Sequence, residues 1–237
     1  MSTSPVRWAY AFIDRPYADF GAACDFWSRV TGSSLSELRG ERGEFVTLLP
    51  PGGDPCLKVQ GVGDGPGGAH VDLVVEDVPG QARRALALGA TGVFSEPGLE
   101  VLRSPAGHPF CLVPWQGETA VPAPTAPANR LDQVCLDTAP DAHDAEVDFW
   151  AELTGWPELP CSGPEFRCLQ ARPVQLLFQR LHAAGPASAH LDVACGDRAA
   201  ARVLHESLGA EFVRDGRSWS VMRDPAGGLY CLTDRAP

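Results

Sequence analysis

The sequence has few basic residues. Its 19 lysines and arginines stand against 30 aspartates and glutamates, which gives a formal net charge of −11. Nucleic acids and anionic membranes attract basic surfaces, so we expect neither as a partner. No apolar run approaches the roughly 20 residues that a membrane-spanning helix needs. The amino terminus also lacks the pattern of a secretory signal, so we expect a cytoplasmic protein. We further expect a monomer or homodimer whose partner is a small molecule.

Several catalytic and metal-binding motifs are missing. The sequence contains no G-x-S-x-G, Walker or dinucleotide-binding pattern. Its eight cysteines form no C-x-x-C pair and lack zinc-finger spacing. Most of them lie in apolar segments such as PFCLV and LYCLT. This context predicts small buried thiols in a reducing compartment.

What the sequence does contain is an internal repeat. FWSRVTG begins at Phe26 and FWAELTG at Phe149, while AHVDLVV and AHLDVAC begin at Ala69 and Ala189. LGA recurs at positions 88 and 208, and SPAGHPFCLV at 104 matches DPAGGLYCLT at 224. Four landmarks in one order, at nearly constant spacing, indicate a tandem duplication.

The two copies are separated by a segment rich in proline and alanine. GETAVPAPTAPANR, residues 117–130, has no apolar periodicity and predicts an extended linker. The expected domains are therefore residues 1–116 and residues 131–237.

Each copy predicts two modules of a strand, a helix and further strands. In the first copy, residues 6–14 predict a strand and residues 20–31 a helix that ends at Gly32. The pattern restarts with strand AHVDLVVEDV and a helix that ends at Gly89. The expected fold is α+β, with four βαβββ modules in curved, mostly antiparallel sheets. A concave sheet face of this kind is a common binding place for small ligands.

This order of landmarks resembles the vicinal oxygen chelate superfamily. The resemblance rests on FW-x-x-x-x-G, HxD, LGA and [DS]PAG-x-x-[FY]-C-L, once in each half. It implies two glyoxalase-like, bleomycin-resistance-like domains. The superfamily includes lyases, isomerases, dioxygenases and proteins that only sequester antibiotics, so the fold alone leaves the function open.

The resemblance also implies where a divalent metal would be held. Metal-dependent members use positions on the first and fourth strands, the His that opens the fifth strand, and a Glu on the final strand. In the first copy these positions fall near Trp8 or Tyr10, near Lys58 or Gln60, and on His70 and Cys111. In the second copy they fall on Asp132, Gln179, His190 and Cys231.

The two copies therefore lead to different expectations about a metal. The first offers one good ligand, His70, because tryptophan cannot coordinate and a lysine would repel a cation. The second offers Asp132, His190 and Cys231 for zinc, iron or manganese. We expect no resident cofactor, and a metal in the second domain is the alternative.

The repeated HxD motif lies on a predicted strand, where residues two apart share a face. His70 and Asp72 would then point into the concavity, and so would His190 and Asp192. Two interpretations remain: an acid–base or ligand-contacting pair, or a polar pair that satisfies the end of a strand.

Alternation along the first strand places large rings on one face. The expected ligand contacts, aromatic and polar, are Trp8, Tyr10, Phe12, Gln60, His70, Asp72, Cys111, Gln179 and Asp192. Alternatively, the rings fill the concavity as core. The aromatic pairs at Phe26 and Phe149 are expected in the core, and His108 on a surface turn.

Two functions follow from these patterns. The first is a metal-independent protein that binds an apolar or aromatic metabolite or antibiotic. The second is a metal-dependent lyase, isomerase or dioxygenase with its site in the second domain. Apart from these two functions, one half could have lost its cavity and serve only to dimerise or brace the other.

Overall fold

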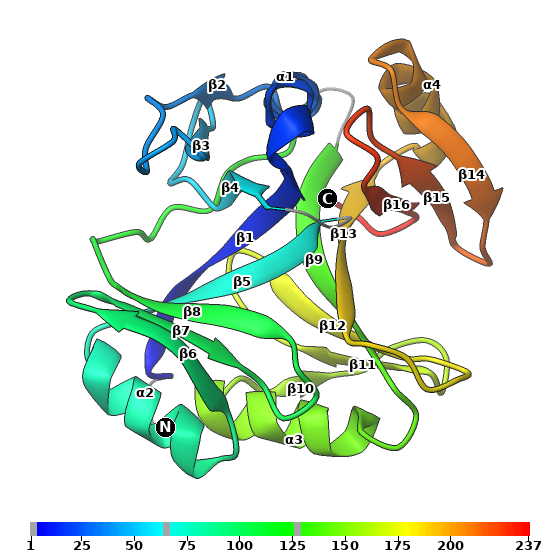
Figure 1. The fold of residues 1–237 in the computed structure, drawn as a ribbon. Helices are drawn as coiled ribbons and strands as arrows, with labels where there is room; N and C mark the ends of the chain where they lie inside the picture. Colours follow the sequence, from blue (N-terminus) through cyan, green and yellow to red (C-terminus); the bar gives the residue numbers. More distant parts are fainter. Residues whose placement is uncertain (1–3, 64–66, 126–128) are drawn as a thin grey trace. The chain divides into compact units, whose positions relative to one another are not determined.

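The computed structural model describes residues 4–63, 67–125 and 129–237 (Figure 1). Both halves have the same order of elements. In the first half these are β1 (Val6–Pro16), η1 (Tyr17–Asp19), α1 (Phe20–Thr31), β2 (Ser34–Leu35), β3 (Phe45–Leu49), β4 (Leu57–Val62), β5 (Gly68–Val75), α2 (Val78–Ala87), β6 (Thr91–Glu96), β7 (Leu99–Arg103) and β8 (Pro109–Pro114). In the second half they are β9 (Asn129–Thr138), α3 (His143–Thr154), β10 (Glu158–Leu159), β11 (Phe166–Leu169), β12 (Gln175–Arg180), β13 (Ser188–Cys195), α4 (Arg198–Ser207), β14 (Glu211–Asp215), β15 (Trp219–Arg223) and β16 (Leu229–Thr233).

Each half forms one open sheet of eight strands. The strand orders are β2-β3-β4-β1-β5-β8-β7-β6 and β10-β11-β12-β9-β13-β16-β15-β14, so the two halves share one topology. Hairpins such as β6–β7 and β7–β8 are antiparallel, while β5 pairs with β8 in parallel. The α+β fold of four modules is confirmed.

The helix ends repeat as well as the strands. Gly32 and Gly155 end α1 and α3 in the left-handed conformation, with φ of 61° and 68°. Glycine reaches this conformation at little cost, which explains the predicted stop at Gly32. Asp77 and Asp197 cap α2 and α4 by accepting a backbone N–H three residues later. In both copies the helix boundaries are therefore determined by residues next to the helix ends.

Long-range contacts divide the chain into two compact units that differ from the two sequence halves. Unit 1 comprises Met1–Tyr10, His70–Thr119 and Val134–Ala189. Unit 2 comprises Ala11–Ala69, Ala120–Gln133 and His190–Pro237. Each unit therefore combines one module of the first copy with one of the second.

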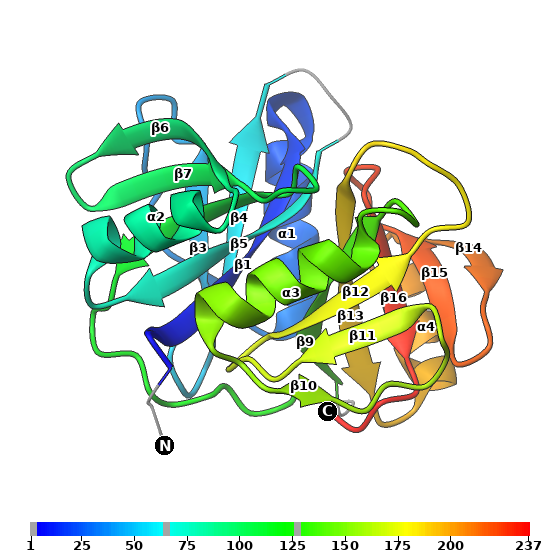
Figure 2. The same ribbon diagram turned by 90° about the horizontal axis from the view of Figure 1, so that it is seen from below.

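Each unit has its own aromatic core. In unit 1, α2 and α3 lie side by side (Figure 2), and the ring of Phe110 packs 5.0 Å from that of Trp150. In unit 2, the rings of Trp27 and Tyr230 are 5.1 Å apart. Phe26, Trp27, Phe149 and Trp150 are all buried, which confirms that the repeated aromatic pairs belong to the core. No helix in the described part of the chain is long and apolar enough to cross a membrane.

Candidate functional site

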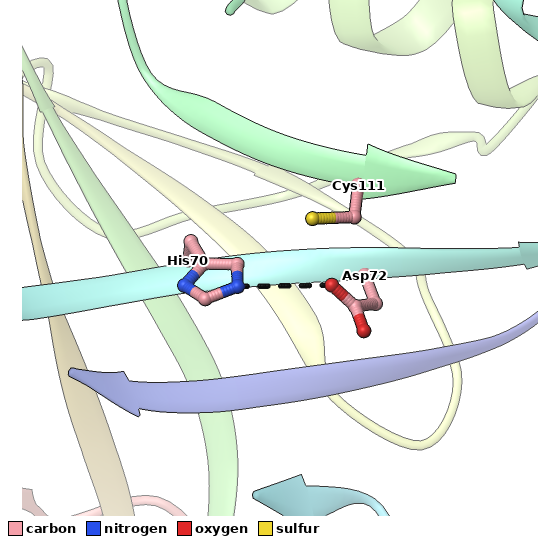
Figure 3. Close-up of side chains that lie close together, drawn as sticks. All are labelled: His70, Asp72 and Cys111. Carbon is pink, nitrogen blue, oxygen red and sulfur yellow. Dashed lines mark ion pairs between the residues drawn. The ribbon is translucent and has the colours of Figure 1, made fainter. Parts of the chain in front are cut away.

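The first candidate site consists of His70, Asp72 and Cys111 in unit 1 (Figure 3). His70 and Asp72 lie two residues apart on β5, so they share one face of the strand. Cys111 lies on β8, directly opposite Asp72 in the parallel register. His70 Nε2 is 3.7 Å from Asp72 Oδ1, and both side chains are at least nine-tenths buried. The repeated HxD motif thus brings a thiol into the group, which the sequence indicates only through the family resemblance.

The second candidate site repeats this arrangement in unit 2 with His190, Asp192 and Cys231. His190 and Asp192 lie on β13, and Cys231 lies opposite Asp192 on β16. The distance from His190 Nε2 to Asp192 Oδ1 is 3.5 Å. His190 is more exposed than His70, at 19% of its side chain against 9%. The imidazole of the second site is therefore easier for solvent or a ligand to reach.

Burial controls the protonation of the second site. It raises the pKa of the Asp192 carboxyl to about 6; His190 opposes this rise, and the nearby Asp132 adds to it. Burial also raises the pKa of the Cys231 thiol, against the effect of a hydrogen bond with His190. Both shifts have the same cause, which is that a low-dielectric interior disfavours the charged form.

Asp132, which the sequence predicts as a metal ligand, is part of an ion pair. Its Oδ2 accepts a hydrogen bond from Arg235 Nε at 2.8 Å. Burial raises the pKa of this carboxyl and Arg235 lowers it. Asp192, which the sequence assigns to ligand contact, is instead the carboxylate that lies with His190 and Cys231.

The remaining predicted contacts lie on the strands that lead to the two sites. Both faces of β1 are buried, since Trp8 and Phe12 are as inaccessible as Ala9 and Ala11. Tyr10 is half-buried and its hydroxyl donates to Glu118 Oε1 at 2.6 Å.

The other predicted polar contacts have close neighbours of their own. In unit 2, Lys58 Nζ lies 5.0 Å from the centre of the Phe12 ring, and Gln60 is paired with Phe45 on β3. In unit 1, Gln179 on β12 accepts from the thiol of Cys135.

His108 is not on the surface, so that prediction is wrong. It is 1% exposed, and its Nε2 lies 3.3 Å from the Thr138 hydroxyl. The sequence context suggests a solvent-exposed turn, but the turn lies under α3, where Glu146 accepts from the Ala106 N–H. All eight cysteines are free thiols; six are buried, while Cys111 and Cys161 are half-buried.

Sequence reasoning also missed a buried ion pair in unit 2. Arg15 Nη2 is 2.7 Å from Asp224 Oδ2, and both side chains are almost completely buried. Trp27 Nε1 donates to the same oxygen at 3.0 Å. The sequence does contain a signal for this pair. Arg15 and Asp224 have opposite charges, and each stands where the other copy has an uncharged residue.

The glyoxalase-like domain family matches residues 10–113 and again residues 133–233. A search of curated protein sequences gives no significant match. Among solved structures, the chain is similar to a Mn(II)-bound glyoxalase from Novosphingobium aromaticivorans, with a TM-score of 0.71 and 17% identity over 99% of this chain and 84% of that one. It is also similar to a 2,2',3-trihydroxybiphenyl 1,2-dioxygenase from Sphingomonas wittichii, with a TM-score of 0.63 and 12% identity over 97% and 90%. A third similar structure is a 2,3-dioxygenase from Pseudomonas, with a TM-score of 0.65 and 14% identity over 98% of this chain and 93% of that one.

The solved structures share the fold with this chain, and the two family matches cover both of its halves. The glyoxalase and dioxygenases are members of the vicinal oxygen chelate superfamily, which confirms the resemblance drawn from the repeated motifs. The chain belongs to the glyoxalase-like domain family and carries one family domain in each half.

Proposed function

We propose that this chain is a small-molecule-binding protein that holds an apolar or aromatic metabolite or antibiotic without a resident metal ion. The observation that carries the proposal is the composition of the two sites. In each, a cysteine stands at the position where the resemblance implies a glutamate ligand. Each site then offers a thiol, an imidazole and a single carboxylate.

This donor set does not fit Mn(II), the ion bound by the similar glyoxalase. Manganese is a hard cation that prefers oxygen ligands, whereas a thiolate favours softer metals. Asp132, the further oxygen ligand suggested by the sequence, is held by Arg235. Metal ligands must also be deprotonated, and burial opposes this at both Cys231 and Asp192.

Without a metal, the sites are well suited to hydrogen bonding. Asp192 accepts from the Cys231 thiol and lies beside the His190 ring, which orients the imidazole. The imidazole then presents a donor or an acceptor to a ligand. Asp72 stands in the same relation to His70 in unit 1.

The test is to purify the protein without chelator, measure its metal content, and titrate it with aromatic ligands while following tryptophan fluorescence. We expect no stoichiometric metal, quenching that EDTA leaves unchanged, and weaker binding in His70→Ala or His190→Ala. Comparing the two variants shows which unit holds the ligand, because they change the same motif in different units. Stoichiometric metal that disappears in His190→Ala would overturn the proposal.

A second function is favoured by one specific observation. The donor atoms of His190, Asp192 and Cys231 all lie within 4.8 Å of one another, as do those of the first site. Three protein ligands with an open position are typical of catalytic zinc, which suits imidazole and thiolate ligands. Bound there, zinc would supply Lewis acidity toward a substrate oxygen, as a metal-dependent lyase or isomerase requires.

Cobalt(II) distinguishes the two functions because a cobalt–thiolate bond produces a charge-transfer absorption band. Under the metal-independent proposal, adding Co(II) gives no such band. A band that is lost in Cys231→Ser and kept in Cys111→Ser would assign a metal to the second site. The opposite pattern would assign it to the first.

A further inference from the structure

The edges of the two sheets are protected to different degrees. The first sheet ends in the edge strands β2 and β6, and the second ends in β10 and β14. An edge strand presents backbone N–H and C=O groups that can pair with a further strand, and proteins commonly shorten or charge such strands to prevent this. β2 and β10 have two residues each, so they offer little to pair with.

Charge protects β14 in unit 2. Its sequence, EFVRD, places Glu211 and Asp215 at the ends and Arg214 beside the centre. The guanidinium carbon of Arg202 lies 3.6 Å from the centre of the Phe212 ring. A strand added to this edge would bring its side chains against charged neighbours along most of its length.

β6 in unit 1 lacks this protection. All six of its residues, TGVFSE, are exposed, and Glu96 at its end is the one charged residue. Val93 is 57% exposed and Phe94 is 53% exposed. Both β6 and β14 contain a bulge at their valine, so the bulge does not account for the difference. Among the edge strands of the described residues, β6 is therefore the long and nearly uncharged one.

The exposure of β6 follows from the layers of unit 1. α2 packs mainly on β7 and β8, and β6 lies beyond them at the end of the sheet (Figure 2). Phe94 is paired with Val101 on β7, which is paired with Cys111 on β8, so the three side chains share one face. Leu102 points to the other face and is 1% exposed. Phe94 therefore lies on the face away from the helix.

Charges at the two ends of β6 determine what kind of strand fits there. Thr91 at the start of β6 is paired with Arg103 on β7. At the other end lie Glu96 and Glu100, and the Oε1 atom of Glu100 accepts from the Ser95 hydroxyl. One end of this edge is therefore positive and the other is negative.

A second copy of the chain is complementary to this pattern. When two such edges run antiparallel, each positive end lies beside the negative end of the other copy, and the uncharged residues meet in the middle. A parallel arrangement would bring like charges together. The formal net charge of −11 makes two copies repel over most of their surface, so an uncharged edge is the favourable place for contact.

We propose that β6 pairs antiparallel with β6 of a second copy and joins the two sheets in a reversible homodimer. Val93 and Phe94 supply the apolar centre, and Arg103 attracts Glu96 of the partner subunit at each end. The same surface is used by both copies, so the assembly closes at two. A contact of one strand with one strand is small, and we expect it to form at micromolar to millimolar concentrations.

Sedimentation velocity of the full chain at increasing concentration measures the dimer, and two valines at the same place in equivalent strands give matched variants. Val93→Lys puts like charges in the middle of the pairing and should weaken the dimer at least about tenfold. Val213→Lys makes the same change in β14 and should leave the dimer unchanged. Both valines are exposed, so neither variant should change the melting temperature.

Charge reversal at the ends tests the direction of pairing. Glu96→Arg and Arg103→Glu should each weaken dimerisation about threefold to tenfold, because exposed ion pairs contribute modestly. The variant with both changes restores opposite charges across the interface and should recover most of the affinity. If either residue served only the fold of its own subunit, the double variant would be worse than the single ones.

Two results would overturn the proposal. One is a parent protein that stays monomeric up to millimolar concentration. The other is a dimer that Val93→Lys leaves intact or that Val213→Lys disrupts, which would place the interface elsewhere. Neither result bears on the ligand-binding function, because these variants change no residue of the His–Asp–Cys sites.

Discussion

In both units a buried carboxylate binds the turn that precedes the final strand of each copy, β8 in unit 1 and β16 in unit 2. The residue that supplies the carboxylate differs between the units. In unit 2 it is Asp224, the first residue of the turn itself. Its Oδ1 accepts from the N–H groups of Ala226 and Gly228, and its Oδ2 accepts from Trp27 and Arg15. In unit 1 the matching residue is Ser104, and its hydroxyl accepts from the His108 N–H.

The carboxylate of unit 1 is supplied by a helix. Glu146 of α3 accepts from the indole of Trp150 at 2.8 Å and from the Ala106 N–H at 2.9 Å. The matching residue in α1 of unit 2 is Ala23. In both units one carboxylate thus joins a helix tryptophan to the turn.

The surrounding residues change together with the source of the carboxylate. In unit 2, Arg15 fills the space beside Gly228, where a Cβ would lie 1.9 Å from the guanidinium carbon. In unit 1 the place of Gly228 is taken by His108, whose ring meets the smaller Thr138. The two copies of the duplicated fold thus share an interaction rather than a set of residues. Within each unit, the residues of this cluster pack well only with one another.

The largest expected effect is the loss of charge in unit 2. Asp224→Asn would leave the buried guanidinium of Arg15 without its counter-charge and should lower the free energy of unfolding by about 3–5 kcal/mol. Glu146→Gln keeps an acceptor for Trp150 and strands no buried arginine, so its cost should be about 1–2 kcal/mol. Urea unfolding of the two variants measures the difference. Equal losses would show that the two carboxylates are equivalent.

A smaller effect depends on pH and on a histidine that is present only in unit 2. His205 is buried, and burial lowers its pKa to about 4; the matching residue in unit 1 is Ala85. Between the ordinary histidine pKa of about 6.5 and pH 4, the unfolded chain binds a proton that the folded chain does not. Stability from this group is therefore present above that window and lost as pH falls through it, by about 3 kcal/mol.

Unfolding free energies of the parent and of His205→Gln at several pH values test this prediction. Glutamine stays neutral and can still accept from the Tyr230 hydroxyl, which lies 2.9 Å from His205 Nδ1. The variant should lose less stability on acidification than the parent. Parallel pH curves would show that His205 titrates normally in the folded protein.

The smallest effect concerns the space that Gly228 leaves for Arg15. Gly228→Ala should cost about 1–3 kcal/mol, because the buried guanidinium has to move away from the new methyl group. In an Arg15→Thr background, which mimics Thr138 in unit 1, the same alanine should cost much less. Thermal melting of the double-mutant cycle measures this coupling, and additive effects would contradict a shared packing arrangement.

Much of the fold could be predicted because its signals are local. The glycine after α1, the aspartates that cap α2 and α4, and the alternation of β5 are all readable within a few residues. The His–Asp pairs of both sites follow from the same alternation. The position of His108 could not be predicted, because a turn next to α3 has the same residues as a turn in water.

Local periodicity and the spacing of the repeats established four modules, their helices and strands, and two HxD motifs on equivalent strands. Only the tertiary structure decided which distant residues share a buried environment. Arg15 meets Asp224, which is 209 residues away, and the Asn129 amide lies on a pocket wall beside Trp27 of α1. The physical reason is that hydrogen-bonded local geometry depends on near neighbours in the chain. Whether a buried charge or amide has a partner depends on which distant residues the fold packs against it.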